Sequence, residues 1–219
     1  MQTQQTPRVV ITGGTGSLGS AITEALRRYG WAVDAPGRAE LDVTSKDSVS
    51  EFFSTRGCDL LVCNAGITRD ALLARLSPDA WDEAWQVNYL GALRCIRAVM
   101  PGMKARGSGH IILIASHSAL HPLVGQAAYA SSKAALIGLM DDLAPECGAC
   151  AVRINAILPG FLETRMTAGL PHGRVEESRA AHTLGRFNTC GAVAGFVRFL
   201  HEELPHTSGQ LFQLDSRPR

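Results

Sequence analysis

Three side chains in the second half of the chain have the types and spacing of a proton-transfer site. Tyr129 and Lys133 are four residues apart, so on a helix the phenol and the ammonium group lie on one face. A neighbouring cation favours the phenolate, and we expect Lys133 to lower the pKa of Tyr129 towards the working pH. Ser116 follows the apolar run 111–115, at the kind of strand end where open α/β sheets bind ligands. The alternative is a surface helix that carries a tyrosine and a lysine by chance.

A glycine-rich segment near the start of the chain, residues 12–19, predicts a nucleotide site. It follows an apolar run and opens a helical pattern, and Gly14, Gly16 and Gly19 match the spacing G-x-G-x-x-G. Glycine permits the tight turn and lets the backbone approach a pyrophosphate, which the amides at the helix start can bind. A plain glycine-rich turn is the alternative, and the strand–turn–helix context favours the nucleotide.

The segment after the second predicted strand indicates which dinucleotide is bound. An NAD enzyme usually places an acid there, whose carboxylate accepts hydrogen bonds from the ribose hydroxyls. Asp34 falls inside the predicted strand instead, and the strand end continues as Pro36-Gly37-Arg38. Because a glycine followed by an arginine suits a 2′-phosphate, we predict NADP(H) as the cofactor. For Arg38 the alternative is an ordinary solvated arginine.

Short β-branched runs alternate with longer helical patterns along the chain, which predicts an α/β fold. The expected strands are 8–12, 31–35, 60–63, 110–115, 151–157 and 210–214, and the expected helices are 18–29, 46–56, 78–105, 127–146 and 189–203. We find no linker or repeat. The prediction is therefore a short flexible tail, residues 1–7, followed by one doubly wound parallel sheet of Rossmann type in residues 8–219.

One connection, residues 36–40, is too short for the usual crossover. A parallel crossover needs about a dozen residues, and only five separate the second strand from Leu41. We therefore predict that the outer strand after the second strand is shortened or missing. The second strand then lies at the sheet edge, where Asp34 and Pro36 are acceptable.

Composition and charge narrow the classes of function. The net charge of +1 argues against nucleic acid as the main ligand, and no apolar run approaches a membrane span. Without a signal-like start, a cytoplasmic protein is expected. Cys147 and Cys150 have the C-x-x-C spacing of a redox pair or half a zinc site, but a second ligand pair is missing at suitable spacing. We predict no metal site, and the sequence leaves a redox role open.

Taken together and in order, the segments 12–19, 63–66, 87–88, 116, 129–133 and 159–160 resemble those of short-chain dehydrogenases/reductases. The resemblance covers the chain from about residue 8. Segments 64–73, 126–133 and 158–166 are similar to bacterial 3-oxoacyl-[acyl-carrier-protein] reductases. There are departures: the glycine turn has Gly16 and Ser17 where these reductases usually have the glycine one position later, and Cys150 stands where many have a basic residue.

The resemblance implies roles for individual residues. Tyr129 would protonate the carbonyl oxygen, Ser116 would hydrogen-bond it, and Lys133 would hold the nicotinamide ribose. Asn88 would hold a water of the proton relay, or else be a helix-packing asparagine. The implied cofactor contacts are the following residues: Gly13, Thr15, Gly16, Ser17, Leu18, Gly19, Arg38, Asp42, Val43, Asn64, Ala65, Gly66, Tyr129, Lys133, Pro159 and Gly160. Among these, Asp42 and Val43 would meet adenine, 64–66 the adenosine side and 159–160 the nicotinamide.

The implied function is NADPH-dependent reduction of a 3-oxoacyl thioester, borne by an acyl carrier protein, in fatty-acid or specialised acyl-chain synthesis. Alternatives are an oxidoreductase for a free ketone or alcohol, and a non-catalytic nucleotide-binding partner protein. We expect a homo-oligomer, dimer or tetramer, formed through helices 78–105 and 127–146, and a mobile lid at 161–182. Lys104 and Arg106 are candidate cations for docking an acidic carrier.

Overall fold

The structure is a computed structural model that describes residues 6–218, so most of the predicted tail lies outside the described residues. Within them, six strands form one parallel sheet in the order β2-β1-β3-β4-β5-β6. The strands are β1 Arg8–Ile11, β2 Ala32–Asp34, β3 Leu60–Cys63, β4 Gly109–Ile114, β5 Val152–Leu158 and β6 Leu211–Gln213. The strand order reverses between β1 and β3, the point where such sheets bind ligands. The predicted α/β fold is confirmed.

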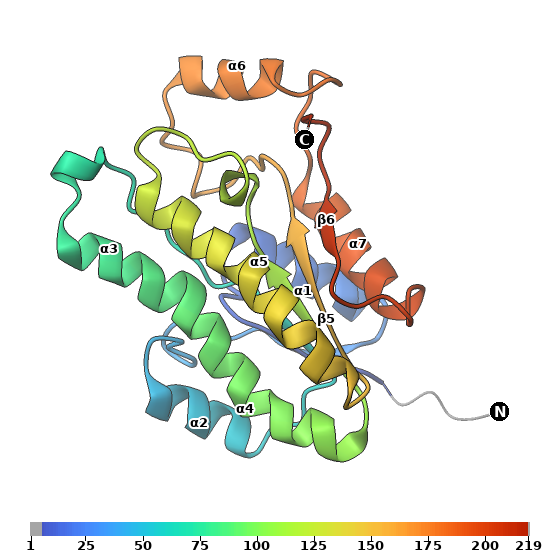
Figure 1. The fold of residues 1–219 in the computed structure, drawn as a ribbon. Coiled ribbons are helices and arrows are strands. Elements are labelled where there is room, and N and C mark those ends of the chain that lie inside the picture. Colours follow the sequence, from blue (N-terminus) through green and yellow to red (C-terminus); the bar gives the residue numbers. More distant parts are fainter. Residues whose placement is uncertain (1–5, 219) are drawn as a thin grey trace.

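Helices cover both faces of the sheet, with α4 and α5 in front and α1 and α7 behind in the view of Figure 1. The helices are α1 Ser17–Arg28, α2 Lys46–Ser54, α3 Pro78–Trp85, α4 Gly91–Arg106, α5 Ala127–Gly148, α6 His172–Ala180 and α7 Cys190–Glu202. One apolar layer joins the sheet to α2, α4 and α5, and a second joins it to α1 and α7. Each fully buried aliphatic side chain in these layers contributes roughly 1.5–3 kcal/mol.

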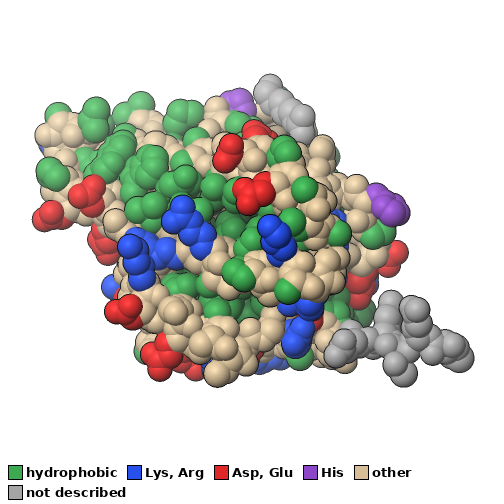
Figure 2. All heavy atoms as spheres, turned by 60° about the horizontal axis from the view of Figure 1, so that its bottom comes forward, with side chains coloured by type: hydrophobic (Ala, Val, Ile, Leu, Met, Phe, Trp, Pro, Cys, Tyr) green, Lys and Arg blue, Asp and Glu red, His purple; other side chains and the backbone are tan. Residues whose placement is uncertain are grey.

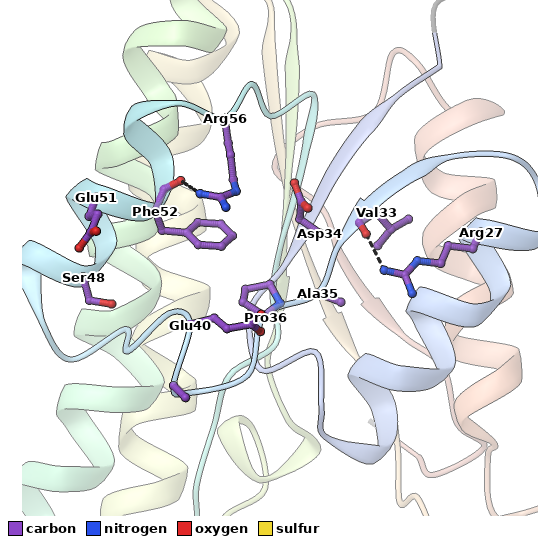
Figure 3. A pocket seen from close by; sticks show the side chains of 11 residues that line it. Arg27, Val33, Asp34, Ala35, Pro36, Glu40, Ser48, Glu51, Phe52 and Arg56 are labelled. Atoms are coloured by element: carbon purple, nitrogen blue, oxygen red, sulfur yellow. Dashed lines mark hydrogen bonds between the residues drawn. The ribbon is translucent and has the colours of Figure 1, made fainter.

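The predicted loss of the outer strand is confirmed. The stretch between β2 and α2, which the structure describes in full, contains turns and no strand or α-helix, so β2 lies at the edge of the sheet. Asp34 is exposed at this edge, and Arg27 Nη2 donates a hydrogen bond to Val33 O over 2.8 Å. Figure 3 shows these side chains around an open hollow of about 540 Å³, bordered on its other side by Phe52 of α2 and by Arg56 just after this helix.

The predicted helix 78–105 is interrupted by a π-helical turn. Ser77 caps its start, because the hydroxyl accepts a hydrogen bond from Ala80 N, and Pro78 occupies the first turn. The π-turn Gln86–Leu90 then separates α3 from α4. Such turns commonly occur at functional sites, and this one contains Asn88.

The helix α6 was not predicted from the sequence. None of its residues is buried, so it has no apolar stripe from which a helical period could be read. In Figure 1 it stands off one end of the molecule, beyond the carboxyl ends of the strands. It lies inside the segment 161–182 that we expected to form a lid.

Two histidines pack together at the amino end of the sheet. His110 is fully buried, and its Nδ1 lies 3.2 Å from Nδ1 of His201 on α7, while its Nε2 lies 3.1 Å from Asn155 Nδ2. Burial, assisted by the positive charge of Arg153, lowers the pKa of His110 well below its usual value and that of His201 to about 4. Both imidazoles are therefore neutral in the folded protein at neutral pH.

We expect the free energy of unfolding to fall as the pH is lowered from about 6.5 towards 4. In this range the unfolded chain protonates both histidines while the folded protein keeps them neutral, so acid favours unfolding. Each histidine adds a slope of up to about 1.4 kcal/mol per pH unit. Urea unfolding across this pH range measures the slope, which His201→Gln should reduce and the exposed-site control His206→Gln should not. An unchanged slope in His201→Gln would contradict the prediction.

Candidate active site

The glycine turn lies at the carboxyl end of β1 and runs directly into α1. Gly13 has a left-handed φ of 64°, and Gly16 is the N-cap of α1. Among the described residues, no side-chain hydrogen bond caps this helix start. The amides of the first helical turn, which begins at Ser17 and Leu18, are therefore available to an anionic group such as a phosphate.

Two glycines of the turn occupy positions that have no room for a side chain. A Cβ built on Gly14 would lie 2.3 Å from Ala35 O, and one on Gly19 would lie 2.5 Å from Gly13 O. The end of β2 and the start of α1 therefore pack directly on the backbone of the turn. This close approach keeps the surface of the turn flat for a dinucleotide.

The segment after β3 holds the glycine turn in place. Asn64 Nδ2 donates hydrogen bonds to Thr12 O and Gly13 O over 3.0 and 3.2 Å. In return, Thr12 Oγ1 accepts the backbone amides of Asn64 and Ala65, each over 3.0 Å. These residues therefore lie beside the turn, and their contact with adenosine stays a prediction.

Ser116, Tyr129 and Lys133 converge at the carboxyl end of β4. Ser116 lies two residues after the end of the strand, and its hydroxyl accepts a hydrogen bond from Ser118 N over 3.2 Å. Tyr129 and Lys133 lie in the first turns of α5, the tyrosine half-buried and the lysine buried. Lys133 Nζ donates to Ile114 O over 2.8 Å, which fixes the ammonium group against the last residue of the strand.

The expectation that Lys133 lowers the pKa of Tyr129 is wrong in this structure. Burial raises the pKa of the Tyr129 phenol, a hydrogen bond from Ser116 opposes the rise, and the negative charge of Asp70 adds to it. The ammonium group of Lys133 is directed to Ile114 O instead, and burial lowers its own pKa to about 8. A phenol with a raised pKa is protonated at neutral pH, which is the form that a proton donor requires.

Asn88 is buried, and its side chain makes three hydrogen bonds to other groups of the protein. Its Oδ1 accepts from Ile67 N over 2.8 Å, and its Nδ2 donates to Ile67 O and Ser132 Oγ over 3.0 and 2.9 Å. A Cβ on Gly66 would lie 3.3 Å from both Asn88 Oδ1 and Lys133 Nζ, so these side chains flank the same point. The contacts fit the packing alternative, and the water-holding role stays a prediction.

Arg38 lies beside the glycine turn with its side chain 78% exposed. The neighbouring Gly37 packs against Thr15, since a Cβ there would lie 3.0 Å from Thr15 Cγ2. Arg38 Nε is 3.4 Å from Asp42 Oδ2. Hydrogen bonds from Thr44, more than the charge of Arg38, lower the pKa of Asp42. Arg38 is therefore close to the turn and only loosely held.

Val43, which we expected to contact adenine, has a buried side chain that packs under α4. A Cβ on Gly91 would lie 2.7 Å from Val43 Cγ2, and Arg94 Nη1 donates to Val43 O over 3.3 Å. The structure thus assigns this side chain to the core, so a contact with adenine would have to come from its backbone.

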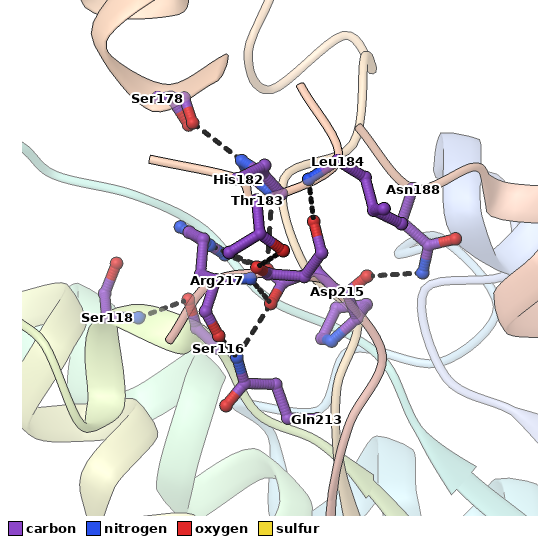
Figure 4. Close-up of polar contacts among 12 residues, drawn as sticks. Ser116, Ser118, Ser178, His182, Thr183, Leu184, Asn188, Gln213, Asp215 and Arg217 are labelled. Atoms are coloured by element: carbon purple, nitrogen blue, oxygen red, sulfur yellow. Dashed lines mark hydrogen bonds and ion pairs between the residues drawn. The ribbon is translucent and has the colours of Figure 1, made fainter. Parts of the chain in front are cut away.

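A polar cluster at the carboxyl end of the chain borders the proline–glycine loop, and sequence reasoning missed it (Figure 4). The Asp215 carboxylate is fully buried and accepts hydrogen bonds from Gln213 Nε2 and Arg217 Nε over 2.8 and 2.7 Å. His182 Nε2 lies 3.5 Å from the same carboxylate. A Cβ on Gly160, which has a φ of 88°, would lie 2.7 Å from Asp215 Cβ. The cluster therefore supports the loop formed by Pro159 and Gly160.

The same carboxyl-terminal segment anchors the chain after α6. Ser216 O accepts hydrogen bonds from Thr183 N and Thr183 Oγ1 over 3.1 and 2.8 Å, and Ser216 Oγ accepts from Leu184 N over 3.2 Å. The expected lid segment 161–182 thus ends at a fixed point. These contacts join residues about thirty positions apart, so the local sequence pattern does not predict them.

The suggestion that Lys104 and Arg106 dock a carrier protein is wrong. Both lie in the last turn of α4, just before β4 begins, and therefore at the amino end of the sheet. Arg106 Nη2 donates to Cys58 O over 2.6 Å and lies 3.4 Å from Asp59 Oδ1. Ser116 is at the opposite end of β4, so these cations cannot form the rim of the site.

Cys147 and Cys150, the C-x-x-C pair, form no disulfide in the described residues 6–218. Cys147 is buried, and burial raises the pKa of its thiol to about 11, while Cys150 is partly exposed and also free. In this part of the chain there is no group of three or more potential metal ligands. No helix within it has the length and apolar character required to cross a membrane.

Comparison with known proteins defines the class. The family model described as "short chain dehydrogenase" matches residues 35–174. The chain is 33% identical to a 3-oxoacyl-[acyl-carrier-protein] reductase of Thermotoga maritima, over 94% of this chain and 95% of that protein. It is 36% identical to a reductase of the same name from Aquifex aeolicus, over 93% and 87% of the two chains. It is 32% identical to the acetoacetyl-CoA reductase of a Synechocystis species, over 88% and 87%.

The chain therefore belongs to the short-chain dehydrogenase family and is an oxidoreductase.

Proposed function

We propose that this protein reduces a 3-oxoacyl thioester to the 3-hydroxyacyl thioester with NADPH. The observation that carries the proposal is the convergence of Ser116, Tyr129 and Lys133 at the carboxyl end of β4, on the same edge of the sheet as the glycine turn after β1. The names of the relatives support the substrate class, since they comprise reductases of 3-oxoacyl-[acyl-carrier-protein] and of acetoacetyl-CoA.

The residues present fit a nicotinamide dinucleotide. Because Gly14 and Gly19 have no side chains, the end of β2 and the start of α1 pack directly on the turn, and the uncapped start of α1 offers amides to the pyrophosphate. At the other end of the site, Gly66 leaves open the point flanked by Asn88 and Lys133. Bound there, the cofactor supplies a hydride to the carbonyl carbon.

The side chains divide the proton chemistry between them. Tyr129 donates its phenolic proton to the carbonyl oxygen, and its raised pKa keeps that proton in place at neutral pH. Ser116 donates a hydrogen bond to the same oxygen and so orients the ketone. Lys133, whose pKa is about 8, exchanges protons near neutral pH and is suited to resupply Tyr129. Its ammonium group also binds the ribose of the cofactor.

Replacing Arg38 should weaken the preference for NADPH over NADH. The guanidinium would pair with the 2′-phosphate that only NADPH carries, so Arg38→Ala should raise KM for NADPH roughly tenfold and leave KM for NADH nearly unchanged. Steady-state kinetics with both cofactors measure the two values. Arg28→Ala, which removes a similarly exposed arginine from α1, is the matched control. If the unaltered enzyme used NADPH and NADH equally well, Arg38 would not recognise the 2′-phosphate.

The substrate class can be tested with a panel of ketones at low and high salt. An acidic carrier protein is recognised through charges at the rim, which act mainly on the association rate and weaken with salt. We therefore expect a lower KM for 3-oxoacyl carrier-protein substrates than for simple thioesters, with a difference that shrinks at high ionic strength. A lower KM for a free ketone than for the carrier-bound substrate, with no dependence on salt, would instead indicate a general ketone reductase. If no substrate led to oxidation of NADPH, the remaining alternative would be a non-catalytic nucleotide-binding partner protein.

We also propose that the protein is a homo-oligomer. Apolar side chains remain exposed around the start of α5, among them Leu73 at 70% and Val124 at 79%. They border a hollow of about 570 Å³, whose lining includes Ala130 and Ala134 of α5 but neither Tyr129 nor Lys133. Figure 2 shows hydrophobic side chains gathered on one side of the molecule, whereas charges of both signs are scattered elsewhere. Such a surface suits a second subunit.

A further inference from the structure

We infer that Arg165 is a cofactor-binding residue that pairs with the pyrophosphate and connects the lid segment to it. The inference rests on the proposed function, because it takes the glycine turn as the cofactor site. Arg165 lies almost 150 residues from that turn along the chain, yet its guanidinium donates a hydrogen bond to Thr15 O. Its backbone amide also donates to Ser17 Oγ, over 3.3 Å.

The backbone that carries Arg165 is held firmly. Leu162 is buried in the core, and Thr167 Oγ1 donates to Leu162 O over 2.8 Å. The same hydroxyl accepts the amide of Thr164 over 2.9 Å. Arg165 therefore projects from a compact hydrogen-bonded turn at the base of the lid segment, so the direction of its side chain is set by the fold.

The glycine turn contributes no cation of its own. Residues 12–19 include no charged side chain, so a pyrophosphate there meets only amides and the positive end of α1. Arg165 is brought to this helix start, and among the described residues no carboxylate lies within ion-pair distance of it. Within residues 6–218, its guanidinium makes one hydrogen bond, to the neutral carbonyl of Thr15.

A phosphate is a better partner for this guanidinium than a carbonyl oxygen. Arginine presents its donors in a planar fork that matches two phosphate oxygens, and charge-assisted hydrogen bonds are about twice as strong as neutral ones. Arg38 follows Gly37, which packs on the side chain of Thr15, whereas Arg165 binds the carbonyl oxygen of Thr15. Because Arg165 also binds Ser17 at the helix start, we assign Arg165 to the pyrophosphate and leave the 2′-phosphate to Arg38.

Binding of cofactor fragments separates these assignments. The ligands are NADPH, 2′-phospho-ADP-ribose, which has the pyrophosphate, and 2′-AMP, which lacks it. Calorimetry on Arg165→Gln should give Kd values at least roughly tenfold higher for the first two ligands and an unchanged Kd for 2′-AMP. Arg165→Lys, which keeps the charge without the fork, should give an intermediate loss. The matched control is Arg174→Gln, which removes another exposed lid arginine paired only with Glu177.

Proteolysis gives a second readout that does not depend on activity. A protease specific for glutamate cleaves after Glu176 and Glu177 in α6, neither of which is next to the substituted residue. Saturating NADPH should slow this cleavage in the wild-type protein and in Arg174→Gln. It should not slow it in Arg165→Gln, because the bound pyrophosphate then has no link to the base of the lid.

The possible outcomes distinguish the inference from the proposed function. Wild-type affinity for NADPH in Arg165→Gln, an equal loss for 2′-AMP, or undiminished protection of α6 would each overturn the role of Arg165. A lowered unfolding midpoint in Arg165→Gln without ligand would assign the residue to stability and would also overturn it. If the wild-type protein itself bound neither NADPH nor NADH, the proposed function would fail instead.

Discussion

Tyr129→Phe should abolish ketone reduction while leaving NADPH binding intact. The substitution removes only the phenolic oxygen, and the ring still fills its half-buried position at the start of α5. General acid catalysis is worth roughly 10²–10⁴-fold in rate, so kcat should fall by about that factor. Single-turnover kinetics and calorimetry measure chemistry and cofactor affinity separately.

The chain provides a matched control for this experiment. Tyr29 is 62% exposed, and its ring lies under the guanidinium of Arg198, far from the site in the sequence and on the α1 side of the sheet. Tyr29→Phe removes the same atom and should leave kcat unchanged. More than a few per cent of wild-type kcat in Tyr129→Phe would refute the assignment of the proton donor.

Gly14→Ala should destabilise the protein, because the added methyl group has no space. Its carbon would lie 2.3 Å from Ala35 O and 2.5 Å from Ala35 C, both of which are backbone atoms that move only with the end of β2. Overpacking of this kind typically costs about 1–3 kcal/mol, and here we expect the upper part of that range. Urea unfolding, monitored by circular dichroism, measures the loss.

Gly16→Ala is the control within the same turn. A Cβ there would meet only Gly13 O, at 3.2 Å, and the backbone conformation of Gly16 is extended and open to any residue. The loss of stability should therefore be about 0.5–1 kcal/mol, because alanine is a poorer N-cap residue than glycine. Similar losses in both variants would show that space at Gly14 is not the cause.

The sheet, the glycine turn and the catalytic spacing were predictable from the sequence because each depends on local pattern. Strands buried on both faces read as continuous apolar runs, as in β3 Leu60–Cys63, where every residue is buried. The missing outer strand followed from chain length alone, since five residues cannot hold a crossover. The positions of Tyr129 and Lys133 followed from helix periodicity.

What sequence reasoning missed depends on long-range packing. Arg165 reaches Thr15, and Asp215 gathers His182 and Arg217, through contacts that join segments distant in the chain. No spacing rule reports such contacts. The helix α6 was not predicted for another reason: a helix without a buried face shows no periodic spacing of apolar residues in the sequence.

Two errors came from treating side chains without their surroundings. We expected Lys133 to lower the pKa of Tyr129 by proximity, but burial raises this pKa and the ammonium group donates to Ile114 O instead. Lys104 and Arg106 were chosen for their charge, although the direction of α4 places them at the amino end of the sheet, away from the candidate site.

The exposed edge at β2 carries its own protection against self-association. An open strand edge offers unpaired amides and carbonyls on which another chain can add a strand, the first step towards aggregation. Here the edge is only three residues long, Asp34 places a charge on it, and Pro36 brings no amide hydrogen to extend it. Arg27 occupies the carbonyl of Val33. Although this chain lacks the outer strand, the edge that is left exposed at β2 is therefore poorly suited to pair with a strand of another molecule.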